Sequence, residues 1–257
     1  MIPLDDPTTL SMLFHLNSEP WLNNEAYRNA IYLPEFKEFD SAGARIGLPA
    51  APTSALSRLI GLRKSTRAFL PERMPLNFVS ALTMSAYGLH KMVEMADGTK
   101  YRRRSVPSAG GMFPLEFFLF AQRVEGLSNG LYHYAVRGHA LELIQQRDIF
   151  PELEPVLYTY PFIQDANLVF AMAAMFPRNQ KKYGPRGYRY TLLEAGHAGQ
   201  NICLAAAELG LSSLCMGGFI DSKLNRMLNL QANKEGVVYA VAVGWDAEEA
   251  NEKGPPA

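Results

Sequence analysis

Residues 102–116 combine three arginines with a turn that has almost no side chain. The turn, residues 107–111, reads Pro-Ser-Ala-Gly-Gly, and its small residues let a ligand approach the backbone closely. Pro107 and Pro114 fix the backbone on either side. Cations beside such a turn suit an anionic ligand with a planar head. An ordinary Gly-rich turn before a strand is the alternative interpretation.

A second cationic pattern lies upstream, where Arg63, Ser65 and Arg67 alternate along the chain. In an extended segment these three residues share one face. Two guanidinium forks and a hydroxyl on one face suit a phosphate or another polyanion. A solvated basic edge is the alternative.

Two further patterns were considered as metal or redox sites. Glu194 and His197 stand three residues apart, as ligands do in di-iron helix bundles, but such a bundle needs the pair twice and the sequence has it once. Cys203 and Cys215 fit neither a disulfide scaffold nor a metal-site spacing. We therefore predict no metal.

Composition limits the possible functions. The 257 residues are 48% hydrophobic and carry a formal net charge of zero, which argues against a nucleic-acid partner bound through bulk charge. No segment is long and apolar enough to span a membrane, and no N-terminal signal is visible. We expect a cytoplasmic protein that binds neither nucleic acid nor membrane.

Periodicity and turn signals outline the elements that must position these residues. We expect an N-terminal arm or lid over residues 1–52, a main domain over 53–245 and a loose tail over 246–257. Within the main domain, the strands are expected at 115–121, 166–175, 212–219 and 236–244, a hairpin at 130–135 and 140–144, and helices at 54–62, 75–90, 149–160, 188–211 and 221–228.

The helix expected over residues 188–211 contains Gly196 and Gly199, each of which costs about 1 kcal/mol relative to alanine. Small residues in a helix usually permit close approach by another helix or backbone. Together with Ala198, they predict that this helix lies at a subunit interface.

Five motifs, in order along the chain, resemble the nitroreductase superfamily of FMN flavoproteins, and most of all its SagB-type thiazole/oxazole-forming peptide dehydrogenases. The resemblance implies an α+β, nitroreductase-like fold with a mainly antiparallel sheet flanked by helices. It also implies a domain-entwined homodimer with FMN at the interface. The motifs cover residues 63–67, 107–114, 130–134, 194–201 and 210–219.

The resemblance also implies how FMN is held. Arg63, Ser65 and Arg67 would hold its phosphate, ribityl chain and pyrimidine edge, where a cation stabilises the reduced anionic flavin. The turn at 107–111 would come from the partner subunit, and two glycines would offer backbone N–H groups near flavin N5. The implied cofactor-binding residues are Arg63, Ser65, Arg67, Arg104, Pro107, Ser108, Ala109, Gly111, Gln200, Gly217 and Gly218.

Two departures from typical nitroreductases bear on this site. Those enzymes have asparagine where this turn has Gly111, whereas glycine resembles the azole-forming branch. They also place basic residues near the C-terminus for the phosphate. Here only Lys253 is available, so an arginine among residues 102–104 is the candidate substitute.

Lys182 and Tyr183 resemble the Lys-Tyr pair of the azole-forming dehydrogenases. Oxidising an azoline to an azole sends a hydride to flavin N5 and removes a proton from the neighbouring carbon, so a base is needed beside the flavin. Tyrosine is a poor base in its neutral form, and adjacent Lys182 would favour its phenolate. A surface basic loop with Tyr183 packed on the next helix is the alternative.

These observations predict an FMN-dependent dehydrogenase that converts azoline rings to azoles in a peptide or peptide-like natural product, with O2 reoxidising the flavin. A cyclodehydratase complex is a candidate partner. One alternative is an NAD(P)H-dependent nitroreductase or another small-molecule flavin oxidoreductase. A second alternative is a flavin-binding scaffold subunit of a biosynthetic complex.

Overall fold

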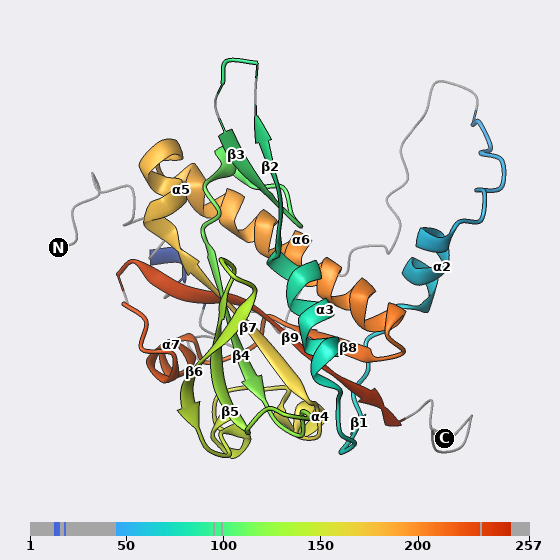
Figure 1. The fold of residues 1–257 in the computed structure, drawn as a ribbon, viewed down its shortest axis with the longest axis vertical. Helices are drawn as coiled ribbons and strands as arrows, with labels where there is room; N and C mark the ends of the chain where they lie inside the picture. Colours follow the sequence, from blue (N-terminus) through green and yellow to red (C-terminus); the bar gives the residue numbers. More distant parts are fainter. Residues whose placement is uncertain are drawn as a thin grey trace.

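The computed structural model describes residues 13–15, 18, 45–94, 96–98, 100–231 and 233–247 (Figure 1). The strands are β1 Phe69–Leu70, β2 Leu89–Glu94, β3 Lys100–Arg104, β4 Leu115–Ala121, β5 Gly130–Ala135, β6 Ala140–Gln146, β7 Leu168–Met175, β8 Ser212–Met216 and β9 Glu235–Asp246. The α-helices with printed bounds are α2 Ala55–Leu62, α3 Leu76–Tyr87, α4 Tyr160–Ile163, α5 Phe176–Tyr183, α6 Arg186–Glu208 and α7 Asp221–Met227. Short 3-10 turns cover Ala109–Gly111 and Phe150–Leu153.

Seven of these strands form one antiparallel sheet in the order β1-β9-β7-β4-β5-β6, with β8 also paired to β9. Strands β2 and β3 form a separate hairpin that stands away from this sheet (Figure 1). A mainly antiparallel sheet flanked by helices confirms the α+β, nitroreductase-like expectation.

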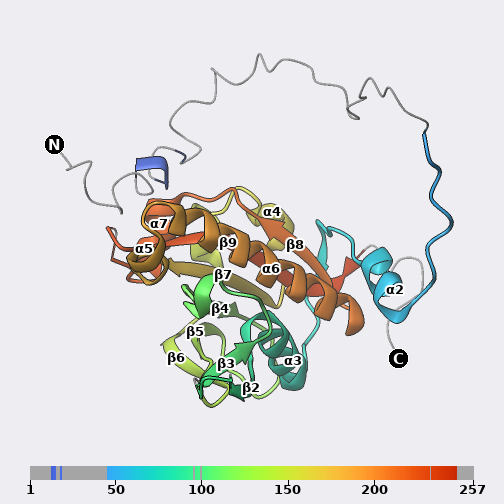
Figure 2. The ribbon, with the colours of Figure 1, turned by 90° about the horizontal axis from the view of Figure 1, so that it is seen from above.

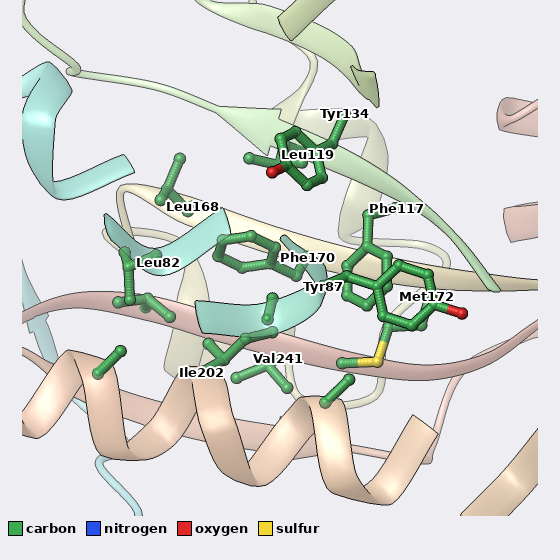
Figure 3. Close-up of a cluster of buried hydrophobic side chains, with 14 of the residues drawn as sticks. Leu82, Tyr87, Phe117, Leu119, Tyr134, Leu168, Phe170, Met172, Ile202 and Val241 are labelled. Atoms are coloured by element: carbon green, nitrogen blue, oxygen red, sulfur yellow. The ribbon is translucent and has the colours of Figure 1, made fainter. Parts of the chain in front are cut away.

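Both faces of the central strands β4, β7 and β9 are buried, which explains why these strands are long and apolar. Along β7, Phe170 and Met172 face the cluster beneath α3 and α6, while Val169 and Ala171 face the cluster that contains α7 residues. Figure 3 shows the first cluster, where Ile202 of α6 lies near Val241 of β9. Because no face is exposed to water, these strands lose the alternation of apolar and polar residues that marks half-exposed strands.

One expected helix is wrong. Residues 149–160 form the short 3-10 turn, further turns and the start of α4 rather than a continuous helix. Pro155, in the middle of this span, lacks the amide hydrogen that a regular helix needs, and its ring would clash with the preceding turn. Pro151 and Pro161 stand in the first turns of the 3-10 helix and of α4, where proline is tolerated. The other expected strands and helices of the main domain are present, with bounds that differ by a few residues.

The N-terminal arm and C-terminal tail fall mostly outside the described residues. Of the arm, Leu13–His15 is helical, and buried His15 contacts Asp221 of α7 with a nitrogen–oxygen distance of 3.3 Å. Residues 45–52 are exposed and extended. The arm and tail boundaries therefore stay predictions.

Helix α6 ends in a Schellman motif built around Gly210, whose φ is +71°. The amide of Leu211 donates to the carbonyl of Ala206 at 2.8 Å, and the amide of Gly210 donates to the carbonyl of Ala207 at 3.2 Å. The motif ends the helix and turns the chain into β8.

The glycines of α6 have roles that differ from the expectation. Gly199 packs inside its own chain, because a Cβ there would stand 2.6 Å from Cε1 of Tyr239 on β9. Ala198 is also fully buried. The expectation that both residues permit approach by a partner subunit is therefore wrong, whereas Gly196 has open space beside it.

We predict that Gly199→Ala destabilises the fold by about 1–3 kcal/mol, because the added methyl group collides with the Tyr239 ring. Urea unfolding of the protein without added cofactor measures this change. In a Tyr239→Ala background the penalty should shrink by more than half, since the obstacle is gone. Equal penalties in both backgrounds would contradict this account of the close packing.

Candidate functional site

The central turn before β4 is held in an unusual backbone conformation. Gly110, Gly111 and Phe113 have φ values of +57°, +67° and +47°. The Phe113 amide donates to the Ser108 hydroxyl at 2.8 Å, which closes the turn. Left-handed conformations suit glycine, and Phe113 adopts one at a cost that the surrounding contacts must offset.

Lys182 and Tyr183 end α5 and lie directly against this turn. A Cβ at Gly110 would stand 2.5 Å from the Tyr183 hydroxyl and 2.6 Å from the Lys182 ammonium, so the missing side chain makes room for both groups. The Tyr183 ring also packs edge-on against Tyr190 at 5.0 Å. The pair therefore forms the last turn of a helix and not a loop, while the packing of Tyr183 on the next helix is as the alternative interpretation expected.

Arg178, one helical turn before Lys182, ties α5 to the turn. Its guanidinium donates to the Phe113 carbonyl at 3.1 Å and to the Glu116 carboxylate at 2.5 Å. Burial raises the pKa of Glu116, but hydrogen bonds from His133 and Arg178 outweigh it and hold the pKa below its usual value. The ionised carboxylate thus anchors the arginine, and the arginine fixes the helix that carries Lys182.

A buried polar group supports the other side of the turn. The Tyr87 hydroxyl donates to Glu194 at 2.5 Å and accepts from the Leu115 amide at 3.3 Å. Arg104 stacks over the rings of Tyr87 and Phe113, with its guanidinium carbon 4.6 and 4.4 Å from their centroids.

Burial, with the neighbouring Glu194, raises the pKa of Tyr87, and burial raises the pKa of Glu194.

Sequence reasoning missed the roles of Tyr87 and Arg178, since neither lies in a motif. It noted Glu194 only as a rejected metal ligand. Among the residues that the structure describes, no group of three His, Cys, Asp or Glu side chains is placed to hold a metal ion.

The turn opens onto a basic cavity of about 1140 Å³. Its walls come from the β2–β3 hairpin, the central turn and the start of the β5–β6 turn. Of the described residues that line it, five are cationic and none is acidic. The lining cations are Lys100, Arg102, Arg103, Arg104 and Arg137.

The other cationic pattern has the predicted alternation. Arg63, Ser65 and Arg67 point outward, and an Arg63 nitrogen lies 3.5 Å from the Ser65 hydroxyl. Lys64 and Thr66 point inward, and both bind the Asp246 carboxylate at 2.9 Å. The segment is further fixed to β8, because the Thr66 amide donates to the carbonyl of Ser213 at 3.1 Å.

The two parts of the candidate site lie at different points along α6. The central turn lies over the first half of the helix, where Ser108 is close to Glu194. The segment around Arg63 lies near Cys203 in the second half and follows α2, beside the end of α6 (Figures 1 and 2).

The remaining candidates lie outside these two parts. Gln200 is exposed on α6. Gly217 follows β8 and lines a small cavity of about 190 Å³ with Tyr188 and Leu192, while Gly218 lies near the Tyr158 ring. Gly217 has open space where a side chain would stand.

Among described helices, none combines the length and apolar character needed to cross a membrane.

Comparison with known proteins identifies relatives of two kinds. A nitroreductase-like protein of Methanocaldococcus jannaschii is 31% identical over 79% of this chain and 97% of its own length. The trifolitoxin-processing protein of Rhizobium leguminosarum bv. trifolii is 31% identical over 69% of this chain, which spans only 49% of that relative. The microcin B17-processing protein of Escherichia coli is 25% identical over 88% of this chain and 86% of its own length.

Solved structures share the fold. The chain superposes with a TM-score of 0.64 on a chain of the E. coli microcin synthetase complex that has truncated pro-microcin B17 bound, at 20% identity and with 93% and 92% of the two chains covered. The peptide-processing relatives confirm the resemblance to the SagB-type branch. The model of the nitroreductase family matches residues 60–245, and the chain therefore belongs to the nitroreductase family.

Proposed function

We propose that this protein is an FMN-dependent dehydrogenase that oxidises azoline rings to azoles in a peptide or peptide-like substrate. The observation that carries the proposal is the contact of Lys182 and Tyr183 with Gly110, which puts a candidate base beside a turn suited to a flat ligand. The two peptide-processing relatives support a peptide substrate. The microcin synthetase complex, one chain of which shares this fold, supports work within a complex, for which we propose a cyclodehydratase as partner.

The residues present fit FMN. Arg63 and Arg67 offer guanidinium groups on the exposed face of a segment whose inward residues are fixed to Asp246, so the face is rigid. Gly111 and Gly217 both have open space where a Cβ would stand, which lets a planar ring approach the backbone. When bound, FMN would supply the acceptor for the hydride that leaves the substrate with its two electrons.

We propose that Arg104 helps to fix the turn in addition to the cofactor contact that the resemblance implies. Its guanidinium stacks over the rings of Tyr87 and Phe113 and lines the basic cavity, and its charge favours the ionised form of the buried Glu194 carboxyl. Arg102 and Arg103 are exposed in the basic cavity, and we propose them as the cations nearest to an incoming anionic group.

In this proposal a complete site needs two copies of the chain, because the resemblance implies that the turn at 107–111 reaches the cofactor from the partner subunit. Surface composition supports a homodimer. Helix α2 buries none of its own residues, although Leu56, Ile60 and Leu62 are apolar. Leu192 and Leu193 are also exposed on α6, beside open Gly196. A partner subunit that covers these side chains would remove apolar area from water.

Within such a site, Tyr183 removes the proton from the carbon beside the one that loses hydride, and Lys182 stabilises the phenolate. Arg178 holds their helix on the turn through Phe113 and Glu116, so both groups keep one position. Positioning of this kind is what a proton transfer between fixed partners requires.

An NAD(P)H-dependent nitroreductase or a related small-molecule flavin oxidoreductase is the second candidate. It is favoured by the M. jannaschii relative, which this chain covers almost completely. A flavin-binding scaffold subunit is the third, and would retain FMN without turnover. Substrate assays of the pure protein, alone and with a cyclodehydratase, separate the three.

We expect Arg67→Ala to weaken FMN binding about 10- to 100-fold, because one charge-assisted hydrogen bond contributes roughly 1.5–3 kcal/mol. Fluorescence titration of the apoprotein with FMN measures this. Arg73→Ala is the matched control, since Arg73 is exposed nearby but outside the proposed face. Equal affinities for both variants would contradict the assignment.

We expect Ile60→Glu to convert the protein from dimer to monomer and to lose FMN with it, because the charge would be buried at the interface. Analytical ultracentrifugation and the flavin absorbance report the two losses. Leu143→Glu is the control, because Leu143 is similarly exposed on β6 at 49%. A wild-type monomer that binds FMN tightly would refute the shared site.

Tyr183→Phe and Lys182→Ala should each lower azoline oxidation by about 10²–10⁴-fold while leaving the flavin spectrum intact, because base catalysis contributes about that much. The double variant should lose little more than either single one. Wild-type turnover by both variants would make the pair structural and favour the small-molecule reductase.

Gly110→Ala should reproduce this loss without touching either side chain's chemistry, because the methyl group would displace both tips. Gly126→Ala matches its backbone strain, with a φ of +70° against +57°, but has open space beside it. Stopped-flow measurement of flavin reduction by the azoline substrate compares them. If both variants lose the same activity, the strain and not the displacement is responsible.

A further inference from the structure

The only two cysteines of the chain meet where α6 crosses β8. The sulfurs of Cys203 and Cys215 are 3.4 Å apart, although twelve positions separate the residues in sequence. Two sulfurs in contact need only a small adjustment to reach the roughly 2.05 Å of a disulfide. Neither cysteine has a role in the proposed oxidation, and both are free thiols.

The two thiols are unequal in a way that suits stepwise oxidation. Cys215 is exposed, whereas Cys203 is only 3% exposed. The hydrogen bond from Cys203, together with Tyr239 and Arg63, lowers the pKa of Cys215 to about 6, while the same bond and burial raise the pKa of Cys203. A thiolate that is exposed beside a buried second thiol has the features of an attacking and a resolving cysteine.

We propose that Cys203 and Cys215 form a reversible intramolecular disulfide when the protein meets a hydroperoxide. The Cys215 thiolate attacks one peroxide oxygen, the O–O bond breaks, and hydroxide leaves as Cys215 becomes a sulfenic acid. The Cys203 sulfur then attacks the Cys215 sulfur, the S–O bond breaks, and the hydroxyl leaves as water with the proton of Cys203. Overall, two thiols and one H2O2 give one disulfide and two waters.

The location gives this pair a structural consequence. Its disulfide would join α6 to β8 covalently, two residues beyond Ser213, whose carbonyl holds the Thr66 amide. Arg63 is also close enough for its charge to favour the Cys215 thiolate. Oxidation therefore removes a thiolate from beside the segment that carries Arg63, Ser65 and Arg67, and changes the charge that this segment meets.

The test uses the full chain without added FMN, so that its result is independent of the proposed flavin chemistry. The protein is treated with one equivalent of H2O2, the reaction is stopped with acid, and the remaining thiols are alkylated. The protein is then digested without reduction, and the peptides are analysed by mass spectrometry. We expect a peptide pair linked through Cys203 and Cys215, lighter than the two thiol peptides by two hydrogens. Dithiothreitol should restore both thiols.

Two variants separate the roles of the thiols. Cys203→Ser should stop at the sulfenic acid of Cys215, which dimedone traps. In Cys215→Ser, the remaining thiol should react at least about tenfold more slowly, because it is buried and protonated. Wild-type thiols that stay titratable, or a link between two chains instead of within one, would overturn the proposal. The wild-type peptide map decides this even if a variant fails to fold.

Discussion

The packing of α6 across the sheet is the constraint on which the rest of the structure depends. Gly199 lets the helix settle onto Tyr239 of β9, and Gly187 lets α5 approach within backbone contact. The side-chain amide of Asn201 then donates to two carbonyls, those of Ser85 on α3 and Ser105 after β3, at 3.1 Å each. One helix thus sets the positions of α3, α5 and the β2–β3 hairpin, which together surround the central turn.

The same helix supports the turn from beneath. Glu194 is 2% exposed and would be costly there as an unpaired charge, so Tyr87 donates to it and the charge of Arg104 faces it. On the outer side, Arg178 binds Phe113 and Glu116. Hydrogen-bonded polar groups hold one geometry better than apolar packing alone, because each hydrogen bond fixes a direction. A strained turn with small residues needs such support to stay in position.

The position of α6 also bears on the assembly that we propose. Its second half lies near the segment around Arg63, and α2 leaves Leu56, Ile60 and Leu62 uncovered near the same end. A second copy of the chain that covers this apolar surface would complete the proposed site. The cysteine pair also lies toward that end of α6, which would place the proposed disulfide beside the cationic face and away from Lys182 and Tyr183.

The sequence alone determined most strands of the main sheet, the fold class through the resemblance, and the local features that depend on neighbouring residues. These include the alternation of Arg63, Ser65 and Arg67 and the end of α6 at Gly210, because alternation and helix capping are properties of a few consecutive residues. The β2–β3 hairpin and α5 were not predicted, and the apolar spacing of residues 149–160 suggested a helix although Pro155 interrupts it. Only the tertiary structure showed that Lys182 and Tyr183 contact Gly110, that Gly199 packs on Tyr239 of β9, and that the Cys203 and Cys215 sulfurs are in contact. The packing of α5, α6 and β8 sets these contacts. The spacing of the residues along the chain does not predict them.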